Sequence, residues 1–90
     1  MNIIFKDKNG RTIKLTNERM KHITKHPEMQ NKLHWIEIAI IYPDFIEEDL
    51  YRSKIIYYYK YLKEEKKYIM VVIKFEEDKD NILTAYLVKK

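Results

Sequence analysis

Two of the three histidines and three basic side chains lie within residues 16–28, and these residue types can exchange protons and hold anions. Residues three or four positions apart share one face of a helix, so Arg19, His22 and His26 form one stripe. Lys21 and Lys25 add positive charge beside it. An imidazole beside a guanidinium suits proton transfer at a phosphate, because the cation holds the anion while the imidazole moves the proton.

This stripe requires a short, well-bounded helix. Thr16 can accept a hydrogen bond from a first-turn amide as the N-cap, and Pro27 ends the helix because the residue before a proline is driven from the helical region. Two other interpretations of the histidines exist. They can be solvated or partly buried residues with no catalytic task, or an i, i+4 zinc pair. The zinc interpretation is weaker, because the chain lacks cysteine and the glutamate of a His-Glu-x-x-His motif.

The composition sets the class of protein. Ninety residues suffice for one domain, 1–90, with a single two-layer core, and 46% of them are hydrophobic. The absence of cysteine excludes disulfides and thiolate metal sites and fits a reducing compartment. No apolar run reaches the roughly 20 residues of a membrane helix. We expect a soluble, unprocessed, cytoplasmic protein with no membrane partner, no metal site and no cofactor.

The net charge of +4 is concentrated in the first half of the chain. Residues 1–42 contain eight lysines and arginines against four acidic residues, whereas residues 43–90 contain ten of each. A local positive field attracts polyanions, of which nucleic acid is the commonest large one. We therefore expect RNA to contact the segment that carries the histidines.

The first half of the chain predicts a hairpin followed by two helices. Asn9-Gly10 favours a tight turn between strands at 2–6 and 11–15. After the histidine helix, the apolar spacing predicts a second helix over Met29–Tyr42.

The second half predicts a sheet. An acidic, turn-like stretch with a short extended piece near Ile46 precedes three strands, at 54–62, 68–75 and 82–88. The expected architecture is α+β, with the N-terminal hairpin and two helices packed on one face of an antiparallel β-sheet.

Strand alternation predicts the two faces of this sheet. The apolar parity, expected to cover the helices, contains Ile69, Val71, Ile73, Phe75, Leu83, Ala85 and Leu87. The opposite parity is amphipathic and carries Lys74, Thr84 and Tyr86. The first of the three strands is aromatic on both parities, with tyrosines at 57, 58, 59 and 61, so alternation leaves its orientation open. These tyrosines either stabilise the sheet by cross-strand packing or stack RNA bases beside lysines.

Several segments together resemble small phage-associated domains of the barnase, EndoU, colicin and RelE-like (BECR) nuclease superfamily. The likeness covers nearly the whole chain and rests on Leu-Thr-Asn-Glu-Arg-Met-Lys-His-Ile-Thr-Lys-His-Pro-Glu-Met at 15–29, Tyr-Pro-Asp-Phe-Ile at 42–46, Tyr-Tyr-Lys at 58–60, Tyr-Ile-Met-Val-Val-Ile-Lys at 68–74 and Leu-Thr-Ala-Tyr at 83–86. The resemblance implies a ribonuclease-like toxin or phage effector that cleaves RNA without a metal. It departs from RelE-like toxins in having few arginines, so ribosome-dependent cleavage is not expected.

In the implied reaction a ribose 2′-hydroxyl attacks the adjacent phosphate while a base takes its proton and an acid protonates the leaving oxygen. The resemblance implies a catalytic set on the helix and the strands, namely His22, Lys60 or Lys74 as the strand cation, Thr84 and Tyr86. The expected RNA-binding residues are Arg19, Lys21, Lys25, His26 and Tyr58.

Two further classes of function remain open. A non-catalytic module of the same fold would hold RNA or a protein partner, such as an antitoxin, through its basic helix and tyrosine-rich sheet. A small interaction protein would instead form a homodimer through Trp35, Ile38 and Ile41, which lie outside the main apolar stripe of the second helix.

Overall fold

In the computed structural model, which describes residues 2–76 and 79–90, the chain begins with two antiparallel strands, β1 (Ile3–Lys6) and β2 (Thr12–Leu15). Gly10 has a φ of 82° in their connection, a conformation that suits glycine. Asp7 closes the connection, because its Oδ1 accepts from the amides of Asn9 and Arg11, both at 2.9 Å. The turn is therefore fixed by one side chain as well as by the glycine.

The helices are shorter than the sequence predicts. Helix α1 (Asn17–Thr24) is capped by Thr16, whose Oγ1 accepts from the Arg19 amide at 3.2 Å. Pro27 opens a 3₁₀ turn, η1 (Pro27–Met29), and α2 begins only at Leu33 (Leu33–Ile41). The predicted start of the second helix at Met29 is wrong, because Asn31 has a φ of 64° and interrupts the helical backbone.

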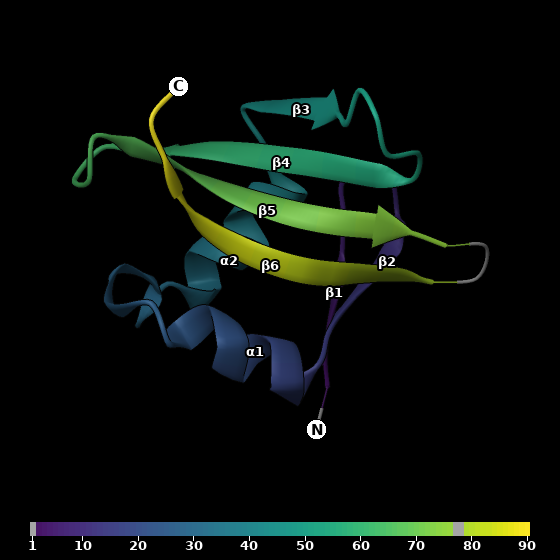
Figure 1. The fold of residues 1–90 in the computed structure, drawn as a ribbon, viewed down its shortest axis with the longest axis horizontal. Coiled ribbons are helices and arrows are strands. Elements are labelled where there is room, and N and C mark those ends of the chain that lie inside the picture. The colour runs from purple at the N-terminus through teal and green to yellow at the C-terminus, as the bar shows by residue number, and fades with distance from the viewer. Residues whose placement is uncertain (1, 77–78) are drawn as a thin grey trace.

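The remaining strands are β3 (Phe45–Glu48), β4 (Ile55–Leu62), β5 (Lys67–Phe75) and β6 (Asp80–Val88). They join β1 and β2 in one six-stranded sheet with the order β1-β2-β6-β5-β4-β3 (Figure 1). The α+β class is confirmed, but the sheet is mixed, because β2 runs parallel to β6 at Ile13↔Asp80 and Lys14↔Asn81. The expectation of a purely antiparallel sheet is therefore wrong at this junction.

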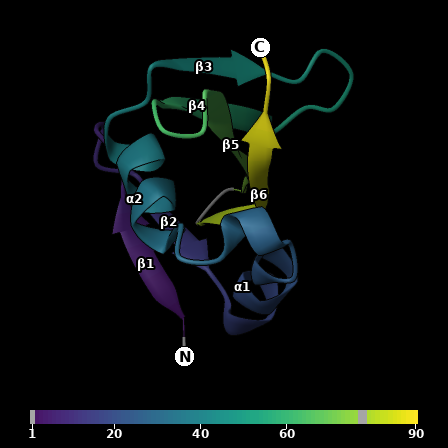
Figure 2. The same ribbon diagram turned by 90° about the vertical axis from the view of Figure 1, so that its left-hand side faces the viewer.

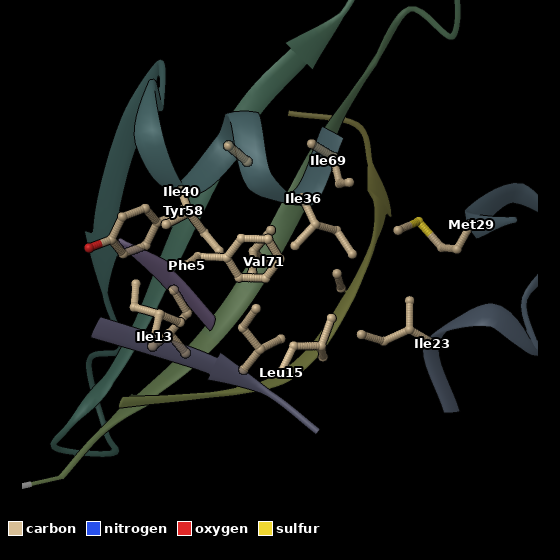
Figure 3. Close-up of a cluster of buried hydrophobic side chains, with 14 of the residues drawn as sticks. Phe5, Ile13, Leu15, Ile23, Met29, Ile36, Ile40, Tyr58, Ile69 and Val71 are labelled. Carbon is tan, nitrogen blue, oxygen red and sulfur yellow. The ribbon is translucent and has the colours of Figure 1, made fainter. Parts of the chain in front are cut away.

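Side chains of α1, α2 and all strands except β3 fill one core (Figure 3). In Figure 2, β1 and α2 lie to the left of β4–β6, and α1 lies below β6. The fully buried members include Ile13, Leu15, Ile23, Met29, Ile36, Ile40, Ile69, Val71 and Ile73. Burying a large aliphatic side chain contributes about 1.5–3 kcal/mol, so this cluster is the main source of stability.

A β-bulge alters the predicted faces of β6. The register between β5 and β6 shifts between Val72 and Ile73, so that Val72 faces Thr84 while Ile73 faces Ile82. Ile82 consequently joins the core with Ala85 and Leu87, whereas Leu83 packs on the other face beside Met70 and Val72. The placement of Leu83 against the helices is therefore wrong, because one extra residue reverses the alternation.

Candidate functional site

Helix α1 lies along β6, where Ile23 is fully buried in the core. Beyond Asn81, β2 no longer pairs with β6, and the side chain of Arg19 reaches this edge. Its Nη1 lies 3.5 Å from the carbonyl oxygen of Leu83, a long hydrogen bond. This contact places Arg19 beside the residue that precedes Thr84, and His22 lies one turn further along α1.

The cations of α1 are exposed and not neutralised locally. Within residues 2–76 and 79–90, none of Arg19, Lys21 and Lys25 forms an ion pair. Five cations elsewhere have acidic partners: Arg11 with Asp80, Lys32 with Glu65, Arg52 with Asp49, Lys60 with Asp44 and Lys90 with Glu47. His22 is exposed on α1, whereas His26 is exposed beyond the end of the helix, in an extended conformation before η1, so the predicted continuation of the stripe to His26 is wrong. The charge excess inferred from the sequence is thus available to an anion at α1.

Three of the predicted catalytic residues lie on the sheet face that points away from the main core. Thr84 is opposite Val72, Tyr86 is opposite Met70, and Lys74 is opposite Ile55. Met70, Val72 and Ile55 belong to a second buried cluster on that face. Tyr86 is 39% exposed and Lys74 is also exposed, so both side chains are accessible to a ligand.

Two predicted site residues lie elsewhere. Lys60 has the opposite parity on β4, and its Nζ is 3.4 Å from Oδ1 of Asp44. Tyr58 is 3% exposed in the main core, where its hydroxyl donates to Oδ2 of Asp7 at 3.0 Å. Burial, together with this hydrogen bond, raises the pKa of Tyr58 above its ordinary value. Tyr58 is therefore not available to stack on RNA, and Lys60 is separated from Thr84 and Tyr86.

The other tyrosines of β4 lie on the outer face with an aromatic cluster. Phe45 stacks on Tyr59 with ring centroids 4.5 Å apart, and Tyr61 and Tyr68 meet edge to face at 5.2 Å. The Nζ of Lys90 lies 4.8 Å from the Tyr59 ring centroid. This cluster settles the orientation that alternation left open. Strand alternation could not identify Lys90 as a member of this cluster, because Lys90 follows the last strand.

A second polar group lies at the end of β3. The Asp49 carboxylate accepts from the Tyr57 hydroxyl and from the amides of Tyr51 and Arg52, at 2.9 and 2.8 Å. These bonds, the one from Tyr57 foremost, hold the pKa of Asp49 below its usual range. No spacing pattern marks this group in the sequence, although an aspartate in a turn-like stretch is a common cap for nearby amides. It holds residues 49–52 in a fixed turn.

The described part of the chain contains no group of three or more His, Cys, Asp or Glu residues with the geometry to hold a metal ion. In the same residues, no helix is long and apolar enough to cross a membrane. Comparisons of the chain with protein-family models, curated proteins and solved structures found no match. The arrangement that remains is a cationic, histidine-bearing helix beside a strand that carries two hydroxyls.

Proposed function

We propose that the chain is a metal-independent endoribonuclease domain, a toxin-like or phage-effector activity, whose site lies between α1 and the outer face of β6. The observation that supports this proposal is the contact of Arg19 with the Leu83 carbonyl, because it joins α1, which carries His22, to the β6 residue that precedes Thr84. The uncompensated charge of α1 supports RNA as the substrate.

The residues have distinct roles in this proposal. Arg19 contacts the scissile phosphate, and His22 transfers the proton between the ribose 2′-hydroxyl and the leaving oxygen. Thr84 and Tyr86 donate hydrogen bonds to the charge that develops on phosphorus, and Lys74 supplies a cation on the same face. Lys60 has no role, because it is paired with Asp44 on the other parity.

The test is cleavage of a fluorescent single-stranded RNA in EDTA by the wild type and by His22→Ala. Loss of a general acid–base group typically costs about 100-fold to 10,000-fold in rate, and the products should carry 2′,3′-cyclic phosphate ends. His34→Ala is the matched control, since His34 is an exposed histidine on α2, and it should cleave at the wild-type rate.

Equal cleavage by His22→Ala and the wild type would refute the assignment of the site. A wild-type protein that binds the RNA but never cuts it would instead favour the non-catalytic binding module.

A further inference from the structure

Strand β3 forms one edge of the sheet, and its outer side has no neighbouring strand in the described residues (Figure 1). The Asp49 amide donates to the Ile55 carbonyl at 3.0 Å, which makes Asp49 and Ile55 a hydrogen-bonded pair. Such pairs alternate along an antiparallel ladder. The backbone groups of Ile46 and Glu48 therefore point outward, ready to bond another strand.

Apolar side chains surround this edge. Of the eight large hydrophobic residues exposed in the described part of the chain, four lie between residues 42 and 51. Tyr42 precedes the strand and is 69% exposed, Ile46 lies on it, and Leu50 and Tyr51 follow it at 88% and 93% exposure. A concentration of apolar side chains at a strand edge is typical of an interaction surface.

The loop that carries Leu50 and Tyr51 is held in place. The bonds to Asp49 from the Tyr51 amide, the Arg52 amide and the Tyr57 hydroxyl fix it against β4. A hollow of about 290 Å³ lies beside it, lined by Leu50, Tyr51, Tyr57, Tyr59 and the acidic residues 47–49. The two side chains are thus presented on an ordered support.

The charges on β3 decide which occupant fits. Pairing of β3 with a second copy can place Ile46 opposite Ile46 or Glu47 opposite Glu47. With Ile46 opposite Ile46, Glu48 of one copy lies opposite Asp44 of the other. With Glu47 opposite Glu47, the two Glu47 carboxylates lie directly opposite each other. Directly opposed like charges destabilise a strand pair. Self-pairing is disfavoured, whereas a strand with a cation opposite Glu48 gains an ion pair, because Glu48 forms none within residues 2–76 and 79–90. Glu47 is already paired with Lys90 at 2.6 Å.

We propose that the β3 edge docks an extended, basic segment of another protein, which adds to the sheet as a seventh, antiparallel strand. One of its cations faces Glu48, and two others compete with Lys60 and Lys90 for Asp44 and Glu47. Its apolar side chains face Phe45 and Ile46, and flanking apolar residues contact Leu50 and Tyr51. Main-chain bonds to Ile46 and Glu48 supply affinity, and the charges select the partner. This surface is distinct from the α1 site and does not depend on RNA cleavage.

The experiment is a titration of the ¹⁵N-labelled chain with the capped peptide Thr-Lys-Lys-Val-Val-Lys-Thr, followed by amide NMR shifts. The largest changes are expected at Ile46 and Glu48, and the counterpart with glutamate in place of lysine should bind at least roughly tenfold more weakly. Glu47→Lys with Glu48→Lys should reverse this preference. The matched control is Glu64→Lys with Glu65→Lys, which changes the net charge equally in the β4–β5 turn and should keep the wild-type preference.

A proline variant tests the backbone contribution separately. Ile46→Pro removes an outward amide, which an edge strand tolerates, and should abolish peptide binding while the other amide signals stay dispersed. Equal binding of the two peptides, an unchanged preference in the double-lysine variant, or shift changes confined to α1 would overturn the proposal.

Discussion

Tyr58 and Asp7 connect the first turn of the chain with the centre of the sheet. Asp7 is 5% exposed, and its two oxygens accept from two amides of its own turn and from the Tyr58 hydroxyl. A buried carboxylate requires such donors, because an unpaired charge in the core is costly. The tyrosine that the sequence suggested for RNA contact therefore has a structural role.

Tyr58→Phe should lower the free energy of unfolding by about 1–2 kcal/mol, because Oδ2 of Asp7 loses a donor inside the core. The raised pKa of Tyr58 adds a pH dependence. The folded state favours the neutral phenol, so this stabilisation is complete below the unfolded pKa of about 10 and is lost as pH rises above it.

Urea unfolding between about pH 8 and about pH 11 measures both effects. Above pH 10 the wild type should lose more stability than Tyr58→Phe. The plots of the free energy of unfolding against pH for the two proteins should therefore converge. The control is Tyr61→Phe, since Tyr61 is 42% exposed and its loss should change stability little. A Tyr58→Phe protein as stable as Tyr61→Phe would show that the buried hydrogen bond contributes nothing.

Side-chain types within a segment predict most helices and strands of this fold. They do not predict which strands pair with each other. The Thr16 cap and the three long strands follow from side-chain type and alternation. The parallel contact of β2 with β6 does not, because nothing in either strand specifies a neighbour so distant in sequence. The bulge at Val72/Ile73 also leaves no composition signal, and it was enough to misplace Leu83.

The same limits explain which residues of the candidate site the sequence placed correctly and which it did not. The pairing of Arg19 with His22 on one face of α1 follows from helical spacing, whereas His26 lies beyond the end of the helix. Lys60 and Tyr58 were misplaced because β4 is aromatic or apolar at nearly every position, so alternation could not say which parity met the helices. Only the register with β5 decides this, since it sets Tyr57, Tyr59 and Tyr61 opposite Val72, Met70 and Tyr68.

An ion pair between Arg11 and Asp80 accompanies the backbone pairing at the β2–β6 junction. Arg11 donates from Nε and Nη2 to Asp80 at 2.7 and 2.8 Å, and its guanidinium lies 4.3 Å from the Phe75 ring centroid. Asp80 is 3% exposed, whereas the Arg11 side chain is about half exposed. The hydrogen bond to Asp80 raises the pKa of Arg11 above its ordinary value, so the guanidinium stays charged.

Arg11→Ala should lower the free energy of unfolding by about 1–2 kcal/mol, because it leaves a buried carboxylate unpaired; solvent access to the guanidinium limits the loss. Arg11→Ala combined with Asp80→Ala should lose less than the sum of the single variants, as a double-mutant cycle measures. Arg52→Ala, which breaks an exposed pair with Asp49, is the control and should have the smaller effect. Strict additivity of the two single variants would mean that Arg11 and Asp80 do not interact energetically.

Across the whole molecule, charge is divided between the two candidate surfaces. Helix α1 carries cations without acidic partners among the described residues, while the acidic β3 edge lies at the other side of the sheet. A polyanion and a basic polypeptide would therefore bind at separate places. This separation predicts that RNA affinity depends on where cations are removed, and not only on how many.

Replacing Arg19, Lys21 and Lys25 together by alanine should weaken binding of a single-stranded RNA more than replacing Lys63, Lys66 and Lys67, although both variants lose three positive charges. Each phosphate contact releases counterions, so removing the α1 cations should also reduce the slope of log affinity against log salt by about two. Fluorescence anisotropy at several salt concentrations measures both quantities. Equal losses of RNA affinity and equal salt slopes in the two variants would mean that the RNA responds to diffuse charge. Helix α1 would then not be a specific RNA-binding site.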